Sequence, residues 1–455
     1  MATSHPTFAH GVVELGRSLR RHETTSSALV AASLRRVHGL DPALNAFALI
    51  DDEGALEAAQ TADRELTSGI DRGPLHGIPV AVKDLIDMAG LPTTCGSASS
   101  FGATAHVDAE VVKRLRQGGA VIVGKTTLHE FAYGATGDRS VHGASRNPRD
   151  PRRMSGGSSG GSAVAVAAGM VPLAVGTDTV GSIRVPAALC GVIGLKPAYD
   201  VVPTTGVYPL APSLDHVGLF AATSDDALVG YQVLAGGEVN VPLESHGRLS
   251  VGWIPPGAIG VTDPHIEELT LELVSQTGLH VETVAGFPGP GHEQSLFDVV
   301  STIQSREAYH VHEPHLEADR DQIDAEVLAR LDRGRTVSAG QYAQADAARS
   351  KLRATVEELL KVHDLLALPT VPTVAPPVGT RTVTVAGTQL EVRSALLSLT
   401  SLWNLVGVPA MSVPAGEIGG LPVAVQLVTA AGRESLMFAA ARELERRRSQ
   451  SPVSS

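Results

Sequence analysis

The sequence predicts an α/β protein whose central sheet is covered by helices on both faces. Short apolar runs with the composition of buried strands alternate with segments in which apolar residues recur every three or four positions. This alternation is typical of sheets that carry helices on both sides. The 455 residues are 43% hydrophobic and only 4% aromatic, which indicates a large core built mainly of Ala, Val and Leu.

The first elements lead the chain to a single lysine. We expect them in this order: helices over residues 8–70, a strand over 77–82, a helix over 108–117 and a strand over 120–123. Pro79 cannot donate a hydrogen bond to a neighbouring strand, so it should be the first residue of its strand or lie at an edge. The strand over 77–82 runs directly into Lys83.

The later elements continue the same alternation. They are a helix of small residues over 162–168, a strand over 173–175, a buried strand over 364–369 and a helix over 435–448. From these elements we predict an N-terminal helical segment packed on the core (1–70), a core (71–235), a variable, largely helical region on the substrate side (236–360), a C-terminal part of the same core (361–445) and a disordered tail (446–455).

Charge and cysteine content argue against several classes of protein. A net charge of −12 disfavours nucleic acid and anionic membranes as partners. Two cysteines, Cys95 and Cys190, are too few for a disulfide framework. The sequence opens without a basic segment followed by an apolar one and holds no run of 18 uncharged apolar residues. We therefore expect a cytoplasmic protein without a secretory signal or membrane span.

Lys83 is the first candidate for chemistry. Burial disfavours the charged form of a lysine and lowers its pKa, and a neutral lysine can accept a proton. The alternative is a surface lysine paired with Asp84 or Asp87, because charged residues are rarely fully buried.

Two glycine-flanked serines are the next candidates. Ser158 lies in residues 156–162, Gly-Gly-Ser-Ser-Gly-Gly-Ser, and Ser182 closes residues 176–182, Gly-Thr-Asp-Thr-Val-Gly-Ser. A serine hydroxyl becomes nucleophilic when a base takes its proton, and the N–H groups of a tight turn can stabilise the oxyanion that follows. Ser182 is equally suited to be a helix N-cap. With Lys83, the two serines indicate nucleophilic acyl transfer.

Other readings of the glycine-rich segment fail on context. A phosphate-binding P-loop would need a lysine after the glycines. The α/β-hydrolase elbow would need a strand directly before Ser158, and residues 149–153 are not one. A flexible linker is disfavoured by the Ala-rich helix that follows.

Several histidines could suggest a metal site. His310, His312 and His315 are spaced unlike any zinc motif, and Pro314 should interrupt a helix that holds all three, so we expect no metal there. His129 lies near the expected site, and its role stays open.

Taken together, these motifs resemble those of the amidase signature family. The matching segments are residues 77–84, 156–162, 176–186, 191–197, 404–410 and 420–422. The resemblance extends roughly over residues 25–445, and it implies a mixed, twisted central sheet covered on both faces by helices.

The resemblance implies a Ser–cis-Ser–Lys triad. Ser182 would be the nucleophile, and Lys83 the neutral base. Ser158 would relay the proton between them after a cis peptide bond at Gly157–Ser158.

The resemblance also implies residues that support the nucleophile. The oxyanion donors would be the backbone N–H groups of Thr179, Val180, Gly181 and Ser182. Asp178 and Arg184 would brace this loop.

The chain departs from the family at two places. Val180 stands where most members have glycine, and a β-branched residue there restricts the loop. Met154 and Ser155 replace the commoner Thr-Pro before the glycines. Neither change removes a catalytic group.

The sequence therefore predicts an amidase that cleaves a linear carboxylic amide through a seryl acyl-enzyme, without a cofactor or metal. Its partner would be a small-molecule amide or carbamate, with no nucleic acid and no membrane, and we allow for a homodimer. One alternative is a carbamate (urethane) or urea-type hydrolase with the same triad. Another is the amidase-like subunit of a tRNA-dependent amidotransferase, which usually carries Gln where this chain has Val185.

Overall fold

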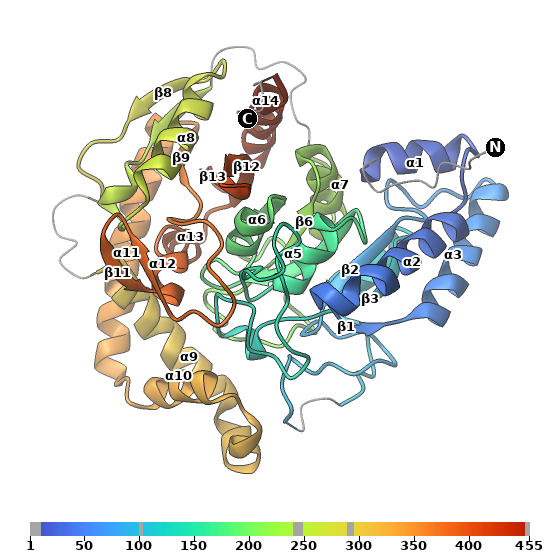
Figure 1. Cartoon of the computed structure of the whole chain (residues 1–455), viewed down its shortest axis with the longest axis horizontal. Coiled ribbons are helices and arrows are strands. Elements are labelled where there is room, and N and C mark those ends of the chain that lie inside the picture. Colours follow the sequence, from blue (N-terminus) through green and yellow to red (C-terminus); the bar gives the residue numbers. More distant parts are fainter. Residues whose placement is uncertain (1–10, 100–102, 240–248, 289–294, 451–455) are drawn as a thin grey trace.

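A mixed, eleven-stranded sheet runs through the molecule (Figure 1). The computed structural model describes residues 11–99, 103–239, 249–288 and 295–450. The strands of the sheet are β1 (Phe47–Ile50), β2 (Pro79–Lys83), β3 (Val121–Thr126), β4 (Leu173–Asp178), β5 (Ile193–Lys196), β6 (His216–Ala221), β7 (Ser250–Trp253), β8 (His280–Thr283), β9 (Leu365–Pro369), β12 (Ala410–Ile418) and β13 (Leu421–Val428).

The strand order mixes parallel and antiparallel pairs. Across the sheet it is β1-β3-β2-β4-β6-β5-β12-β13-β9-β7-β8. The strands β3, β2 and β4 are parallel neighbours, as are β9, β7 and β8, and the strands between these two groups pair antiparallel. Parallel strands end at the same edge of a sheet, so Lys83 at the end of β2 and Asp178 at the end of β4 come to the same side.

Fourteen helices are described. They are α1 (Val12–Arg20), α2 (Ser26–Leu44), α3 (Asp52–Thr67), α4 (Glu110–Gln117), α5 (Gly160–Ala167), α6 (Arg184–Cys190), α7 (Ser224–Ala235), α8 (Pro264–Ser275), α9 (Leu296–Asp319), α10 (Ala325–Arg335), α11 (Ala339–Val362), α12 (Val392–Leu397), α13 (Ser401–Val406) and α14 (Glu434–Gln450). A separate hairpin pairs β10 (Thr382–Val385) with β11 (Thr388–Glu391).

Helices cover both faces of the sheet, as the sequence predicts. Along β2, Val80 and Val82 join one buried cluster, which includes residues of α1, α4, α7 and α14. Ala81, between them, joins a second cluster with residues of α2, α3 and α5. Because neighbouring side chains of a strand point to opposite faces, these clusters are the two layers of core on either side of the sheet.

A third buried cluster lies under the C-terminal half. It joins residues of α9, α11, α12 and α13 to strands β9, β12 and β13, and these helices gather on one side of the molecule (Figure 1). Val180, in the loop after β4, belongs to this cluster. The glycine-rich half and the C-terminal half of the chain therefore share one core.

Several expected elements match the structure. Pro79 is the first residue of β2, where its missing N–H costs no hydrogen bond within the sheet. The expected strands and helices around residues 108–126, 160–178 and 364–369 are present as α4, β3, α5, β4 and β9.

Other expectations need correction. The helical reading of residues 8–70 missed β1, whose four apolar residues directly follow α2 and pair with β3. The region 236–360 holds, besides its helices, β7 and β8, which extend the main sheet. The tail predicted as disordered from residue 446 is helical to Gln450, and residues 451–455 lie outside the described residues.

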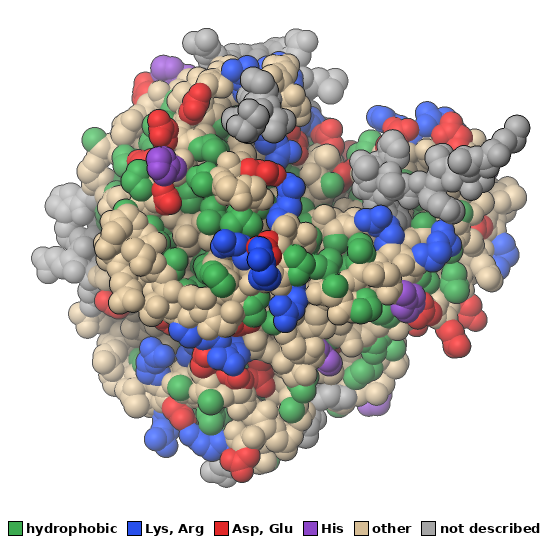
Figure 2. All heavy atoms as spheres, viewed as in Figure 1, with side chains coloured by type: hydrophobic (Ala, Val, Ile, Leu, Met, Phe, Trp, Pro, Cys, Tyr) green, Lys and Arg blue, Asp and Glu red, His purple; other side chains and the backbone are tan. Residues whose placement is uncertain are grey.

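Charge on the surface and the length of the helices bear on the expected partners. On the face drawn in Figure 2, basic and acidic side chains are interspersed. No helix in those ranges is both long and apolar enough to cross a bilayer.

Candidate active site

Lys83 ends β2 with its side chain completely buried. Hydrogen bonds join its Nζ to Ser158 Oγ (2.7 Å) and to Thr177 Oγ1 (2.8 Å). Asp84, which could have paired with Lys83 at the surface, instead forms a buried ion pair with Lys125, 2.7 Å away. The surface reading of Lys83 is therefore wrong.

Burial changes the acid–base behaviour of Lys83. It lowers the pKa to about 7, against the opposing effect of the carboxylates of Asp178 and Asp215. An ammonium loses its hydration inside the protein, and two hydroxyl partners replace only part of it. A large share of the Lys83 side chains is therefore neutral at physiological pH.

The segment around Ser158 is held from two sides. The Gly157–Ser158 peptide bond is cis, as the resemblance implied. The N–H of His129 donates to the carbonyl of Ser158 (3.0 Å), and the N–H of Ser159 donates to the carbonyl of Ser182 (3.2 Å). These bonds keep Ser158 beside Lys83 and bring its backbone to that of Ser182.

Ser182 lies in a tight loop between β4 and α6. The carboxylate of Asp178 accepts hydrogen bonds from the N–H groups of Gly181 (2.7 Å) and Ile183 (3.1 Å). Gly181 has a φ of +139°, and a Cβ at this position would overlap Thr400 Oγ1. The loop therefore requires glycine, and it leaves the Ser182 hydroxyl without a hydrogen-bond partner among the described residues.

The geometry corrects the expected set of oxyanion donors. The N–H of Gly181 is not free, because it donates to Asp178. The N–H groups of Thr179, Val180 and Ser182 donate to none of the described residues. Three of the four expected donors thus remain available.

A buried ion pair fixes this loop. Arg184 Nη2 lies 2.9 Å from Asp178 Oδ1, and both side chains are fully buried. The Nη1 of Arg184 donates to Gln426 Oε1 (2.7 Å), and Asn404 Nδ2 donates to the carbonyl of Asp178 (2.8 Å). Residues from α13 and β13 therefore complete the shell around the loop that carries Ser182.

Known proteins match nearly the whole chain. The family model described as Amidase matches residues 28–438. The chain belongs to the amidase signature family. It is accordingly an amidohydrolase of that family, built on the same mixed sheet flanked by helices.

Three proteins illustrate the range of these relatives. A glutamyl-tRNA(Gln) amidotransferase chain from Anaeromyxobacter sp. (strain K) is 36% identical over 475 residues, covering 96% of each chain. A solved amidase structure is 35% identical with a TM-score of 0.90, covering 96% of this chain and 99% of that one. Native peptide amidase from Stenotrophomonas maltophilia is 27% identical with a TM-score of 0.80, covering 99% of both chains.

Four residues of this amidase's site were missed by pattern reasoning. Thr177 hydrogen-bonds Lys83, and Asp215 accepts a hydrogen bond from Thr179 Oγ1. Thr400 donates to the carbonyl of Val180, and Gln426 accepts from Arg184. Thr177 lies inside the glycine-rich stretch and could have been found there. The other three come from distant parts of the chain and carry no local signal.

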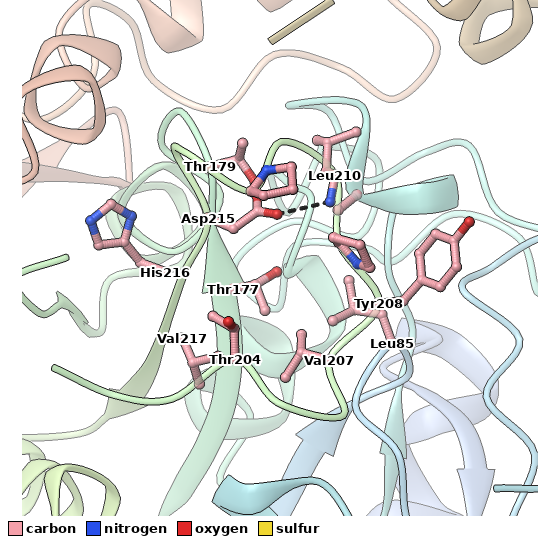
Figure 3. A pocket seen from close by; sticks show the side chains of 13 residues that line it. Leu85, Thr177, Thr179, Thr204, Val207, Tyr208, Leu210, Asp215, His216 and Val217 are labelled. Atoms are coloured by element: carbon pink, nitrogen blue, oxygen red, sulfur yellow. Dashed lines mark hydrogen bonds between the residues drawn. The ribbon is translucent and has the colours of Figure 1, made fainter. Parts of the chain in front are cut away.

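A cavity of about 220 Å³ lies next to Thr177, the residue that bonds Lys83 (Figure 3). Thr177 and Thr179 line it, opposite Leu85 and Tyr208, while the side chains of the triad do not. Asp215 borders it, and its carboxylate accepts from the N–H of Leu210 (2.9 Å), the bond drawn in Figure 3. The space is large enough for ordered water next to the threonine that bonds the lysine.

The candidate metal cluster is not assembled. Contrary to expectation, α9 continues through Pro314, but His312 is buried with its ring centre 4.5 Å from that of Phe131, while His310 is exposed. The side chain of His315 lies outside the described residues. No group of three potential ligands occurs among the residues that the structure describes.

His129 supports the site through its backbone. Burial lowers the pKa of its imidazole well below the usual range, so the ring is neutral. Its Nδ1 lies 3.4 Å from Thr136 Oγ1, and its ring packs directly against Gly134.

The buried ion pair gives a testable prediction. Replacing Arg184 by Met leaves Asp178 buried without a cation, and we expect a loss of about 3–5 kcal/mol in the free energy of unfolding. Denaturant unfolding followed by circular dichroism measures this change. The control is Arg149→Met, which breaks an exposed pair with Glu417 and should cost at most about 1 kcal/mol. Equal losses in both variants would contradict the role assigned to Arg184.

Proposed function

We propose that this amidase hydrolyses a linear carboxylic amide through an acyl-enzyme on Ser182, with Ser158 as proton relay and Lys83 as base. The observation that carries the proposal is the fully buried Lys83, with a pKa of about 7, hydrogen-bonded at 2.7 Å to the serine beside the Ser182 segment. A base with a pKa near the working pH is the most effective proton acceptor.

Acylation begins with a neutral Lys83. Its amine takes the hydroxyl proton of Ser158 as Ser158 takes that of Ser182, and Ser182 Oγ forms a bond to the substrate carbonyl carbon. The tetrahedral intermediate then breaks its C–N bond. Ser158 delivers a proton to the leaving nitrogen, and Lys83 returns one to Ser158, so the amine departs neutral and the ester on Ser182 remains.

The loop supplies the charge stabilisation that these steps need. The free N–H groups of Thr179, Val180 and Ser182 are the donors for the oxyanion, and the Asp178–Arg184 pair holds their peptide planes in place. Water then attacks the ester with the same relay as base, and the carboxylic acid and free enzyme are released.

Carbamates and urea-type compounds are a second substrate class for the same triad. Their scissile carbon is also a carbonyl bonded to nitrogen, and nothing in the relay distinguishes them. Small-molecule substrates are supported by the buried position of Ser182, of which 3% is exposed. We assign the choice of substrate to residues from about 236 to 400, and we propose that the enzyme works in the cytoplasm.

A second candidate function is that of the amidase-like chain in a tRNA-dependent amidotransferase. The 36% identity to such a chain favours it. Val185, fully buried against the loop at Gly181, stands where those chains usually carry Gln, which disfavours it.

Loss of the nucleophile tests the main proposal. We expect Ser182→Ala to lower kcat at least about 10³-fold on every substrate of a screen of aryl amides, esters and carbamates with graded acyl size. Ser162→Ala is the matched control, because this buried serine bonds Thr126 and Val175 rather than the triad. Full activity of Ser182→Ala, with an unchanged circular dichroism spectrum, would refute the assignment.

The pKa of Lys83 predicts the pH dependence. The base is neutral above its pKa, so kcat/KM should rise about tenfold per pH unit below about 7 and level off above it. A pH–rate profile from about pH 5 to 9 measures this, and a flat profile would contradict the proposal. Lys83→Arg keeps a permanent charge and should be inactive throughout this range.

The amidotransferase reading makes a different prediction. We expect the purified chain to hydrolyse simple amides alone, without partner proteins and without glutamine-dependent transfer. Copurification from cells of the source organism, followed by assay of glutamine-dependent amidation of glutamyl-tRNA, checks this. Activity that appears only in such a complex would replace the main proposal.

A further inference from the structure

Four arginines gather where α9, α10 and α12 meet the loop after β3. They are Arg139, Arg330, Arg381 and Arg393. The first three pair with carboxylates: Arg139 and Arg381 with Glu326, and Arg330 with the same residue at 3.4 Å. Arg393 is the exception, because it forms no ion pair with any residue in the described ranges.

The side chain of Arg393 is nevertheless held by its neighbours. Its guanidinium carbon lies 5.8 Å from the ring centre of Tyr133 and 5.9 Å from that of Phe297. Its Nη2 donates to Gln304 Oε1 (3.0 Å), which is its only hydrogen bond to a described residue. Its Nε is buried and donates to none of the residues that the structure describes.

This arrangement leaves most donors of the guanidinium unused. Arginine has five N–H donors in a planar fork, and Gln304 accepts from one of its two Nη groups. Buried donors without partners are costly, and structures rarely retain them without water or a ligand. The guanidinium lies over the Tyr133 and Phe297 rings, and a carboxylate can accept two parallel hydrogen bonds from the edge of such a group.

The positive charge of Arg393 is not paired off within the described part of the chain. Burial lowers the pKa of Arg393, and burial followed by the nearby charge of Arg393 lowers the pKa of Arg330 to about 10. Glu391 opposes the effect of burial on Arg393, but it forms no ion pair with it and accepts from Ser394 Oγ instead. An arginine keeps its proton in proteins, so Arg393 carries a positive charge without a carboxylate partner in the described part of the chain.

The same residues are connected to the triad. The carbonyl of Gly134, next to Tyr133, would be 3.2 Å from a Cβ on Gly157, so this backbone packs against the cis peptide bond. Arg393 is the second residue of α12, which ends at Leu397, three residues before Thr400, whose Oγ1 donates to the carbonyl of Val180 (2.8 Å). At a rise of about 1.5 Å per helical residue, Arg393 lies about 6 Å along the helix from its last residue, Leu397.

One apolar cluster connects the oxyanion loop to the helices around Arg393. Val180 shares its buried cluster with residues of α9 and α12, among them Val300, Ile303, Val392 and Leu396. A substrate that contacts both the oxyanion loop and Arg393 would therefore lie against an apolar region and end at a cation.

We propose that Arg393 binds a carboxylate of the substrate, so that the preferred substrates are amides with a carboxylate separated from the scissile carbonyl by an apolar spacer. This inference rests on the proposed amide hydrolysis and specifies its substrate class. Arg393 acts in binding and takes no part in the proton relay.

The test compares matched substrates. One series pairs the p-nitroanilides of butyric to heptanoic acid with the mono-p-nitroanilides of succinic to pimelic acid. A second places the carboxylate on the amine side, as N-acyl-4-aminobenzoates against N-acylanilines. We expect kcat/KM of the wild type to favour the carboxylate in one series by at least about tenfold, and Arg393→Met to remove that preference mainly through KM.

Two further variants serve as controls, one for the positive charge of Arg393 and one for the surrounding arginines. Arg393→Lys keeps a cation without the fork and should retain part of the preference. Arg381→Met removes a neighbouring arginine that already pairs with Asp138 and Glu326, and it should keep the preference within about threefold.

The outcomes separate this inference from the proposed function. Hydrolysis of neutral amides without carboxylate preference in either series, or equal loss in the Arg381 and Arg393 variants, overturns the assignment of Arg393 and leaves amide hydrolysis intact. Calorimetry with the Ser182→Ala protein measures binding of the same amides independently of their hydrolysis. Carboxylate binding that depends on Arg393 but without hydrolysis by the wild type would support the site and refute the function.

Discussion

The buried ion pair between Asp178 and Arg184 is the interaction on which the site depends. Burial raises the pKa of a carboxyl group, yet Arg184 holds the pKa of Asp178 well below its usual range, so the pair is ionised inside the core. Removing two charges from water is expensive, and such pairs are weak sources of stability. Here the pair instead fixes geometry, because Asp178 binds the loop N–H groups while Arg184 reaches α13 and β13.

The same exclusion of water produces the base. Lys83 is buried by the strands on either side of β2, and no carboxylate of the described residues is close enough to pair with it. Its neighbours are hydroxyl groups, which hydrogen-bond the neutral amine as readily as the ammonium. In one small region the fold thus keeps the carboxylate of Asp178 charged by pairing it with a cation. It favours the neutral form of Lys83 by burying this lysine without an anionic partner.

The packing gives Val180, which stands where most family members have glycine, a structural role. Its side chain is buried in the cluster formed by α9, α12 and α13, so the loop is anchored to the region that we propose for substrate choice. Arg393 directly follows Val392, which is a member of that cluster. A change of residue in the oxyanion loop is therefore linked by direct packing to the helices that would recognise the rest of the substrate.

The class of fold, the candidates for the triad and the glycine at position 181 could all be read from the amino-acid sequence. Strand composition, helical periodicity and backbone freedom are local properties, visible within a few residues. The sequence did not reveal β1, which is too short to carry a period, or the helical end of the tail. The folded chain was needed to show that Gly181 gives its N–H to Asp178, that Gln426 and Thr400 complete the site, and that Arg393 has no carboxylate partner among the described residues. The physical reason is that burial and pairing of charges depend on residues hundreds of positions apart, which meet only when the sheet forms.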